Sequence, residues 1–152
     1  MEKIRRNVFE TNSSSVHSIV LKHDKPYVSE LPVSNGTLTV NCKDYDGFGR
    51  TNTKIISTQM EKVQYLISWI SASKYNDVND VKNSWQFDTL LGAIQKIAQD
   101  VKDIEICDIE SACFNHQNSP HNGNECIVDL YNEDAVMNFI FNDNIIVECY
   151  FD

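Results

Sequence analysis

The sequence predicts an α+β fold, a single domain over residues 1–152 in which a mostly antiparallel sheet packs against two to three helices. Short β-branched runs stand near both ends of the chain, and apolar residues recur at helical spacing in the middle. The composition is that of a globular protein, because 41% of the 152 residues are hydrophobic. A chain of this length buries about two-thirds of its unfolded surface around one core.

The first third of the chain predicts strands and turns. Residues 16–21 are apolar and β-branched, which predicts a strand, and the polar residues 10–15 in front of it predict a loop. Asn35 and Gly36 form a dipeptide typical of a two-residue hairpin turn, followed by a second predicted strand at residues 37–42. The turn therefore predicts an antiparallel pair early in the chain.

The middle of the chain predicts two helices. Thr58 and Glu61 have the spacing of a capping box, and apolar residues three or four apart behind them predict a helix over residues 59–73. Residues 76–83 are polar and acidic, which predicts a linker. The stripe of the second helix consists of Phe87, Leu90, Leu91, Ile94, Ile97, Ala98 and Val101, which we assign to the core.

The last third predicts strands around one short helix. Apolar alternation predicts a strand over residues 104–109, and the polar residues 111–125 predict a loop or tight hairpin. Residues 126–131 predict another strand, residues 133–141 a short helix, and residues 145–151 a closing strand.

The charge balance restricts the class of partner. The chain has 13 basic and 22 acidic residues and a net charge of -9, so we expect no direct binding to nucleic acid, which depends on basic groups that displace counterions. The same charge favours encounter with the basic groove of a protein that itself handles nucleic acid. The alternative is that the acidity serves solubility alone.

The lengths of the apolar runs and the number and positions of the cysteines indicate the cellular compartment. No apolar run approaches the ~20 residues that cross a bilayer, and no apolar segment follows the basic residues at the start, so we expect a cytoplasmic protein without a membrane span or secretory signal. The odd number and scattered positions of the cysteines favour reduced thiols over a disulfide framework. They are Cys42, Cys107, Cys113, Cys126 and Cys149.

Four candidate zinc ligands stand within one predicted loop. Cys113, His116, His121 and Cys126 have the spacing C-x2-H-x4-H-x4-C, and four thiolate or imidazole groups are the ligands of a tetrahedral zinc site. The spacing resembles that of retroviral-type zinc knuckles, although His116 stands where those have a cysteine and Pro120 where they have a glycine. The alternative is a polar surface loop whose cysteines begin or end strands. Zinc is the only cofactor that the sequence suggests.

A second candidate site is the hydroxyl-rich segment at residues 11–18. Its histidine titrates near neutral pH and stands beside several serines, so His17 and His116 are candidates for an acid and a base, with Ser13 and Ser15 as candidate nucleophiles. The alternative is a turn whose Asn and Ser side chains satisfy their own backbone. The candidate binding residues are Thr11, Asn12, Ser13, Ser14, Ser15, His17, His116 and Gln117.

The segment V-F-E-T-N-S-S-S-V-H-S at residues 8–18, with the two arginines and the asparagine before it, resembles the N-terminal signature of a family of small, largely uncharacterised bacteriophage and prophage proteins. Weaker similarity follows at Phe48, at residues 62–66 and at residues 115–119, where the family pattern is an acidic residue followed by His-Gln-Ser. This chain has Asn115 in the acidic place. The resemblance implies a phage setting, and its two histidine motifs coincide with His17 and His116.

Two hypotheses follow for the function. The first is a phage-type accessory protein that acts by binding, as an acidic inhibitor of a host defence protein that handles nucleic acid, in the manner of an anti-CRISPR or other counter-defence protein. The second is a small enzyme or sequestering protein that acts on a nucleotide or signalling molecule through His17 and His116. The sequence favours the first and leaves catalysis open.

Overall fold

The computed structural model describes residues 14–19, 25–42, 54–73, 77–109 and 126–151. In these ranges the chain forms six strands and four helices. The strands are β1 (Ser14–Ile19), β2 (Val33–Ser34), β3 (Thr37–Asn41), β4 (Lys54–Ile56), β5 (Asp103–Cys107) and β6 (Ile146–Phe151). The helices are α1 (Gln59–Ser73), α2 (Val78–Lys82), α3 (Trp85–Gln95) and α4 (Glu133–Phe141).

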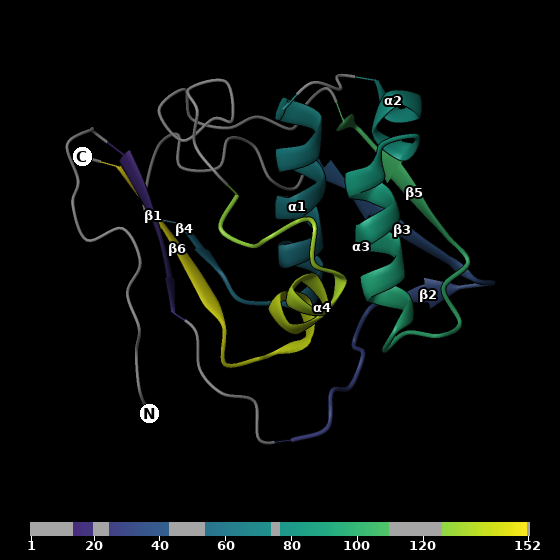
Figure 1. Cartoon of the computed structure of the whole chain (residues 1–152), viewed down its shortest axis with the longest axis horizontal. Coiled ribbons are helices and arrows are strands. Elements are labelled where there is room, and N and C mark those ends of the chain that lie inside the picture. Colours follow the sequence, from purple (N-terminus) through teal and green to yellow (C-terminus); the bar gives the residue numbers. More distant parts are fainter. Residues whose placement is uncertain (1–13, 20–24, 43–53, 74–76, 110–125, 152) are drawn as a thin grey trace.

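The described strands form two three-stranded sheets. The first has the order β1-β6-β4 and is antiparallel throughout. The second has the order β2-β3-β5, in which β2 and β3 are antiparallel and β3 and β5 are parallel. In the view of Figure 1 the two sheets lie on opposite sides of α1. The chain returns from β3 to β5 through the helices, as a parallel pair requires.

The hairpin turn predicted at Asn35 and Gly36 is confirmed, and it joins β2 to β3. The first predicted strand, which is β1, pairs with β6 rather than with β3. Both residues have positive φ, 52° and 81°, which is the backbone conformation of a two-residue hairpin turn. The Gly36 carbonyl also accepts hydrogen bonds from the backbone N–H groups of Lys102 and Asp103, at 2.7 and 3.2 Å. The turn therefore positions the start of β5 beside β3.

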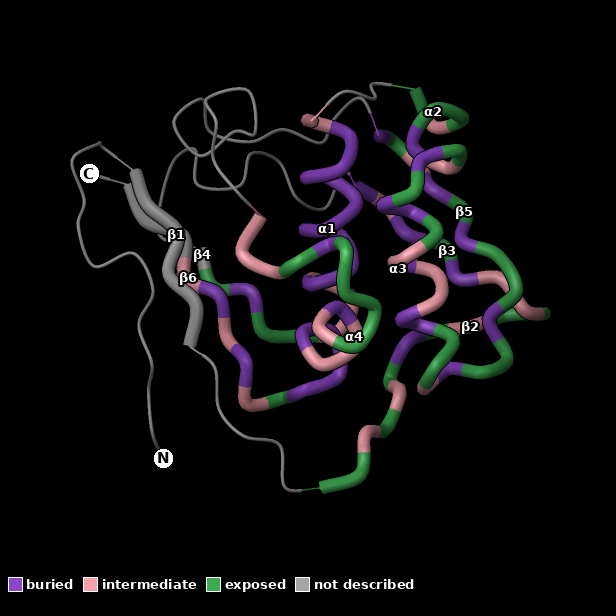
Figure 2. The backbone as a smooth tube through the Cα atoms, viewed as in Figure 1, coloured by how far each residue is buried: buried purple, intermediate pink, exposed green. Residues whose placement is uncertain are grey.

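Helix α1 has the bounds that the sequence predicts, and it is the most buried element of the described fold. Its capping box is formed: the Glu61 N–H donates to Thr58 Oγ1 at 3.2 Å, and the Thr58 N–H donates to Glu61 Oε1 at 3.1 Å. Figure 2 shows α1 buried along most of its length. Because α1 contacts α2, α3, α4 and β3, it is buried on nearly every side.

The buried hydrophobic side chains form one continuous cluster that includes both sheets. Leu38 and Val40 of β3 and Ile104 and Ile106 of β5 are buried while their neighbours along each strand are exposed or partly so, because successive side chains of a strand point to opposite faces. The other sheet contributes residues such as Ile56 and Val147.

Two predictions for the middle of the chain are wrong in detail. The predicted linker at residues 76–83 contains α2, because the Asp77 carboxylate accepts the Asn79 N–H at 2.7 Å and Val81 is fully buried as an anchor. The second helix ends at Gln95 rather than near Val101. Ala98 and Val101 are still buried, but they follow in turns after α3.

Two further predictions are wrong, one at the start of β1 and one before α4. Ser14 and Ser15 belong to β1 rather than to a loop, because Phe151 and Tyr150 of β6 lie opposite them in the register. Residues 126–131 form turns rather than a strand. The chain reverses there because the Asn132 N–H donates to the Asp129 carbonyl at 3.1 Å.

The remaining elements agree with the sequence. The predicted strand after α3 is β5, the short helix is α4, and the closing strand is β6. The α+β fold class is therefore confirmed, with strands in two sheets. Within the described ranges, no helix is both long enough and apolar enough to span a membrane.

Candidate binding surface

The hydroxyl-rich segment is described only in part. Ser14, Ser15 and His17 lie on β1, where the His17 backbone is opposite Glu148 of β6. Thr11, Asn12 and Ser13 lie outside the described residues, as do His116 and Gln117. A shared site of His17 and His116 therefore stays a prediction, and so do the serine candidates.

One of the four candidate zinc ligands is described. Cys126 is partly buried, and its burial raises the pKa of its thiol to about 12, while backbone N–H groups of Val128 and Ile127 act in the opposite direction. The thiol would have to lose its proton on binding zinc. Cys113, His116 and His121 lie outside the described residues. In the described part of the chain no three His, Cys, Asp or Glu side chains gather as metal ligands.

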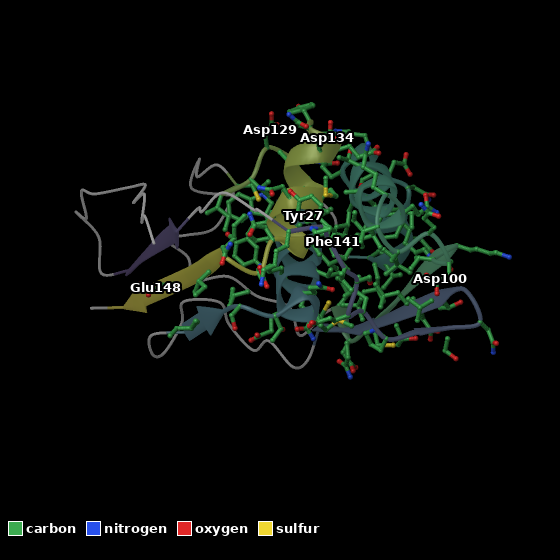
Figure 3. All side chains as sticks on the ribbon, turned by 90° about the horizontal axis from the view of Figure 1, so that it is seen from below. Tyr27, Asp100, Asp129, Asp134, Phe141 and Glu148 are labelled. Atoms are coloured by element: carbon green, nitrogen blue, oxygen red, sulfur yellow. The ribbon has the colours of Figure 1, made fainter. Side chains whose placement is uncertain are left out.

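The C-terminal end of α4 is tied into the fold by a polar network. Tyr27 Oη donates to Asn138 Oδ1 at 2.6 Å, and Asn142 Nδ2 donates to the same oxygen at 3.3 Å. The Asn142 carbonyl accepts from Lys62 Nζ at 2.9 Å and from the Ile145 N–H at 3.0 Å. This network joins the segment before β2, helix α1 and the turn into β6, so its role is structural. Figure 3 labels Tyr27 and Phe141 at this end of α4.

Lys62 is the most unusual ionisable group of the network. Its side chain is fully buried, and its ammonium lies 5.9 Å from the centre of the Phe139 ring. Burial lowers the pKa of Lys62 to about 8, against the charges of Asp143 and Glu61, which raise it. A lysine with such a pKa suits nucleophilic chemistry when a substrate reaches it. Lys62 has no exposed surface, so we assign it to the core.

The N-terminal ends of α3 and α4 carry an exposed aromatic pair, which we call the aromatic patch: Trp85 and Tyr131. The two rings are stacked, with centroids 4.2 Å apart and an interplanar angle of 18°. Trp85 is 40% exposed and Tyr131 82% exposed, even though one face of the Tyr131 ring lies against Trp85. The outer face of Tyr131 is therefore open to solvent.

Four carboxylates stand within three residues of Trp85 or Tyr131 in the sequence, and we call them the acidic rim: Asp88, Asp129, Glu133 and Asp134. All are exposed. Figure 3 labels Asp129 and Asp134 at the same end of α4, opposite to Tyr27 and Phe141. Lys96 Nζ lies 3.1 Å from Asp134 Oδ1 and 3.6 Å from Glu133 Oε1. Its hydrogen bond to Asp134, together with the charge of that carboxylate, raises the pKa of Lys96 above its usual value.

One carboxylate of the acidic rim lies against α3 at Gly92. A Cβ atom at Gly92 would lie 2.5 Å from Glu133 Oε2, so only glycine leaves room for this carboxylate against α3. Four carboxylates and one ammonium leave the surface negative. An exposed aromatic ring beside carboxylates can bind a cationic group. The arrangement is therefore suited to recognition.

Sequence reasoning missed the aromatic patch, although part of the signal was present. Trp85 stands two residues before Phe87, which places it on the side of the helix away from the apolar stripe. A tryptophan on a polar helix face indicates an exposed aromatic residue. Tyr131 gave no such signal, because its exposure follows from the turn at Asp129, whose Oδ1 accepts the Tyr131 N–H at 2.9 Å.

Comparison with known proteins finds no match: no protein-family model, no curated protein and no solved structure is similar to this chain.

Proposed function

We propose that this protein acts by binding, as a phage-type inhibitor of a host defence protein that handles nucleic acid. The observation that carries the proposal is the net charge of -9, together with an exposed aromatic pair whose neighbours in the sequence include exposed carboxylates. Solubility alone explains dispersed charge. It does not explain a stacked pair of exposed aromatic rings, and paired aromatic residues on a surface are typical of interaction sites.

An acidic protein can compete with the phosphate backbone of nucleic acid for the same basic groove. A protein that handles nucleic acid has a basic groove that attracts the phosphate backbone. An acidic protein is attracted to the same groove and is steered toward it at a distance, which speeds the encounter. Once bound, its carboxylates take the place of the phosphates. The same carboxylates repel nucleic acid, so the inhibitor does not bind the substrate of its target.

The phage setting is supported by the resemblance of residues 5–18 to the phage and prophage family. Residues 14–18 of this segment belong to strand β1, which pairs with β6. Short phage proteins that act on host defence have to recognise one host protein, and binding through a charged surface is a mechanism available to a chain of this size.

The test is capture from host extract followed by an inhibition assay. The full chain is immobilised, and bacterial host extract is passed over it at low salt and eluted at high salt. We expect a nucleic-acid-binding protein to be retained and released by salt, because screening weakens the attraction between exposed charges. The captured protein is then purified, and its binding to DNA or RNA is measured with and without an equimolar amount of this protein. Undiminished nucleic-acid binding by every captured protein would contradict the proposal.

A further inference from the structure

The outer face of Tyr131 is a solvent-exposed aromatic surface. Trp85 supports the inner face at a centroid distance of 4.2 Å, and 82% of Tyr131 remains exposed. A ring stacked on one side presents its other side flat to solvent. Stacking is also the geometry in which a third planar group adds to a pair.

Both aromatic residues lie next to the capped start of a helix, and the caps restrict where the two residues can lie. Trp85 is the first residue of α3 and follows Ser84, whose Oγ accepts the Phe87 N–H at 3.2 Å. Tyr131 precedes Asn132, whose Oδ1 accepts the Ala135 N–H at 3.1 Å. Each cap therefore fixes the backbone next to the residue that carries the ring. The aromatic patch is therefore preorganised, and binding to it costs little further ordering of the rings.

The acidic rim also has a role in stabilising the starts of the helices. Asp88, Glu133 and Asp134 lie in the first turns of α3 and α4, where carboxylates favourably oppose the helix dipole. That role accounts for these three residues. Asp129, which precedes α4, has a structural role too, because its Oδ1 accepts the Tyr131 N–H at 2.9 Å. Neither role accounts for the exposure of Tyr131, since a helix start needs no aromatic ring in water.

We infer that the aromatic patch and acidic rim together bind an arginine side chain of a basic partner protein, with the guanidinium stacked on the outer face of Tyr131 and its N–H groups directed to the carboxylates. A guanidinium is planar and cationic, so it satisfies the ring and the carboxylates at once. A lysine ammonium satisfies the charge but does not stack. Nucleobases stack too, but their phosphates are repelled by the rim. This inference rests on the proposed function and names the surface and the group that it recognises.

The test compares two cationic peptides and one nucleic acid. Binding of an oligoarginine peptide, an oligolysine peptide of the same length and a short single-stranded DNA is measured by calorimetry with the full chain. We expect the arginine peptide to bind roughly 3-fold or more tightly than the lysine peptide, because only arginine stacks. We expect no binding of the DNA.

Variants locate the binding to the ring. Tyr131→Ser should weaken oligoarginine binding roughly 3- to 10-fold, and Tyr131→Phe should retain it, because the ring face and not the hydroxyl makes the contact. Ile55→Ser is the matched control. Ile55 is an exposed apolar residue on β4, in the sheet β1-β6-β4, so its replacement should leave oligoarginine binding unchanged. Asp129→Asn should weaken binding more than Asp100→Asn, because Asp100 lies apart from Asp129 and Asp134 in the view of Figure 3.

The outcomes separate this inference from the proposed function. Equal oligoarginine affinity of Tyr131→Ser and the unaltered protein would overturn the inference, and so would equal binding of the two peptides. DNA binding that requires Tyr131 would overturn it too, because the patch would then be a base-stacking surface. If Tyr131→Ser inhibits the captured host protein as strongly as the unaltered protein does, the surface is wrong and the function stands. If no host protein is inhibited while oligoarginine binding still depends on Tyr131, the function is wrong and the surface stands.

Discussion

The two ends of α4 differ in almost every physical respect. At the C-terminal end, Phe139 is buried and Asn142 is linked to α1 through the Lys62 ammonium at 2.9 Å. At the N-terminal end, Tyr131 is exposed and the carboxylates of Glu133 and Asp134 face solvent and Lys96. The nine-residue helix α4 is thus packed into the fold at its C-terminal end and exposed to solvent at its N-terminal end.

This difference teaches how a small acidic chain can hold the proposed recognition surface in place. Polar groups at the buried end are satisfied by protein partners, which is what burial requires. Charged groups at the exposed end carry little stability, because solvent screens them, and so are free to serve binding. Substitutions at the two ends should therefore separate stability from recognition.

The largest expected effect compares an aromatic residue from each end. Phe139→Ala removes a buried ring that packs on Tyr65, with ring centroids 6.3 Å apart, and should lower the free energy of unfolding by about 3–5 kcal/mol. Tyr131→Ala removes an exposed ring and should cost less than about 1 kcal/mol. Urea denaturation monitored by circular dichroism measures both. Similar losses in the free energy of unfolding for the two variants would contradict the proposed difference between the two ends of α4.

The second prediction concerns the buried charge of Lys62. In Lys62→Met the Asn142 carbonyl keeps its hydrogen bond from the Ile145 N–H at 3.0 Å, and the cost of burying a charge is removed. At pH 7 the variant should therefore be at least as stable as the unaltered protein. A clear loss of stability at pH 7 would mean that the Lys62 ammonium is worth more to the fold than its burial costs.

The pH dependence of that difference has a definite sign. The pKa of Lys62 is about 8 in the folded protein and has its ordinary value of 10.5 in the unfolded chain, so between these pH values the unfolded chain binds more protons. The stability of the unaltered protein should rise relative to Lys62→Met from pH 8 to pH 10.5, by roughly 3 kcal/mol at most. Groups common to both proteins cancel in this comparison. A difference that is flat with pH would contradict the lowered pKa.

The smallest expected effect is at the exposed end. Gly92→Ala gains about 0.5–1 kcal/mol of helix propensity in α3, while the added Cβ displaces the Glu133 carboxylate. That carboxylate is the end of a flexible, exposed side chain, and Lys96 keeps its contact with Asp134 at 3.1 Å. The variant should therefore be slightly more stable in thermal denaturation. A drop in melting temperature would indicate that Glu133 is held firmly against α3.

Local signals predicted the elements whose ends are capped by neighbouring residues. The capping box of Thr58 and Glu61 placed the start of α1, and the positive φ available to Asn35 and Gly36 placed the hairpin. Both depend on contacts within a few residues. The same reasoning failed at Ser14, which is in a strand because of Phe151, and at residues 126–131, where turns replace the predicted strand.

The candidate site was less predictable than the fold. Net charge predicted a basic partner, but charge alone does not locate a surface. The stack of Trp85 on Tyr131 joins residues 46 positions apart, and no periodic pattern connects them. The histidine and zinc predictions depend on residues outside the described ranges, apart from His17 and Cys126, and they stay predictions.

By itself the sequence determined the acidity, the α+β class and the local helices and turns, because caps, turn dipeptides and apolar periodicity act between near neighbours. Only the tertiary structure decided that the strands divide into two sheets and that Lys62 is buried while Tyr131 is exposed. The physical reason is that burial and strand pairing depend on which distant segment lies opposite, and local preference does not contain that information.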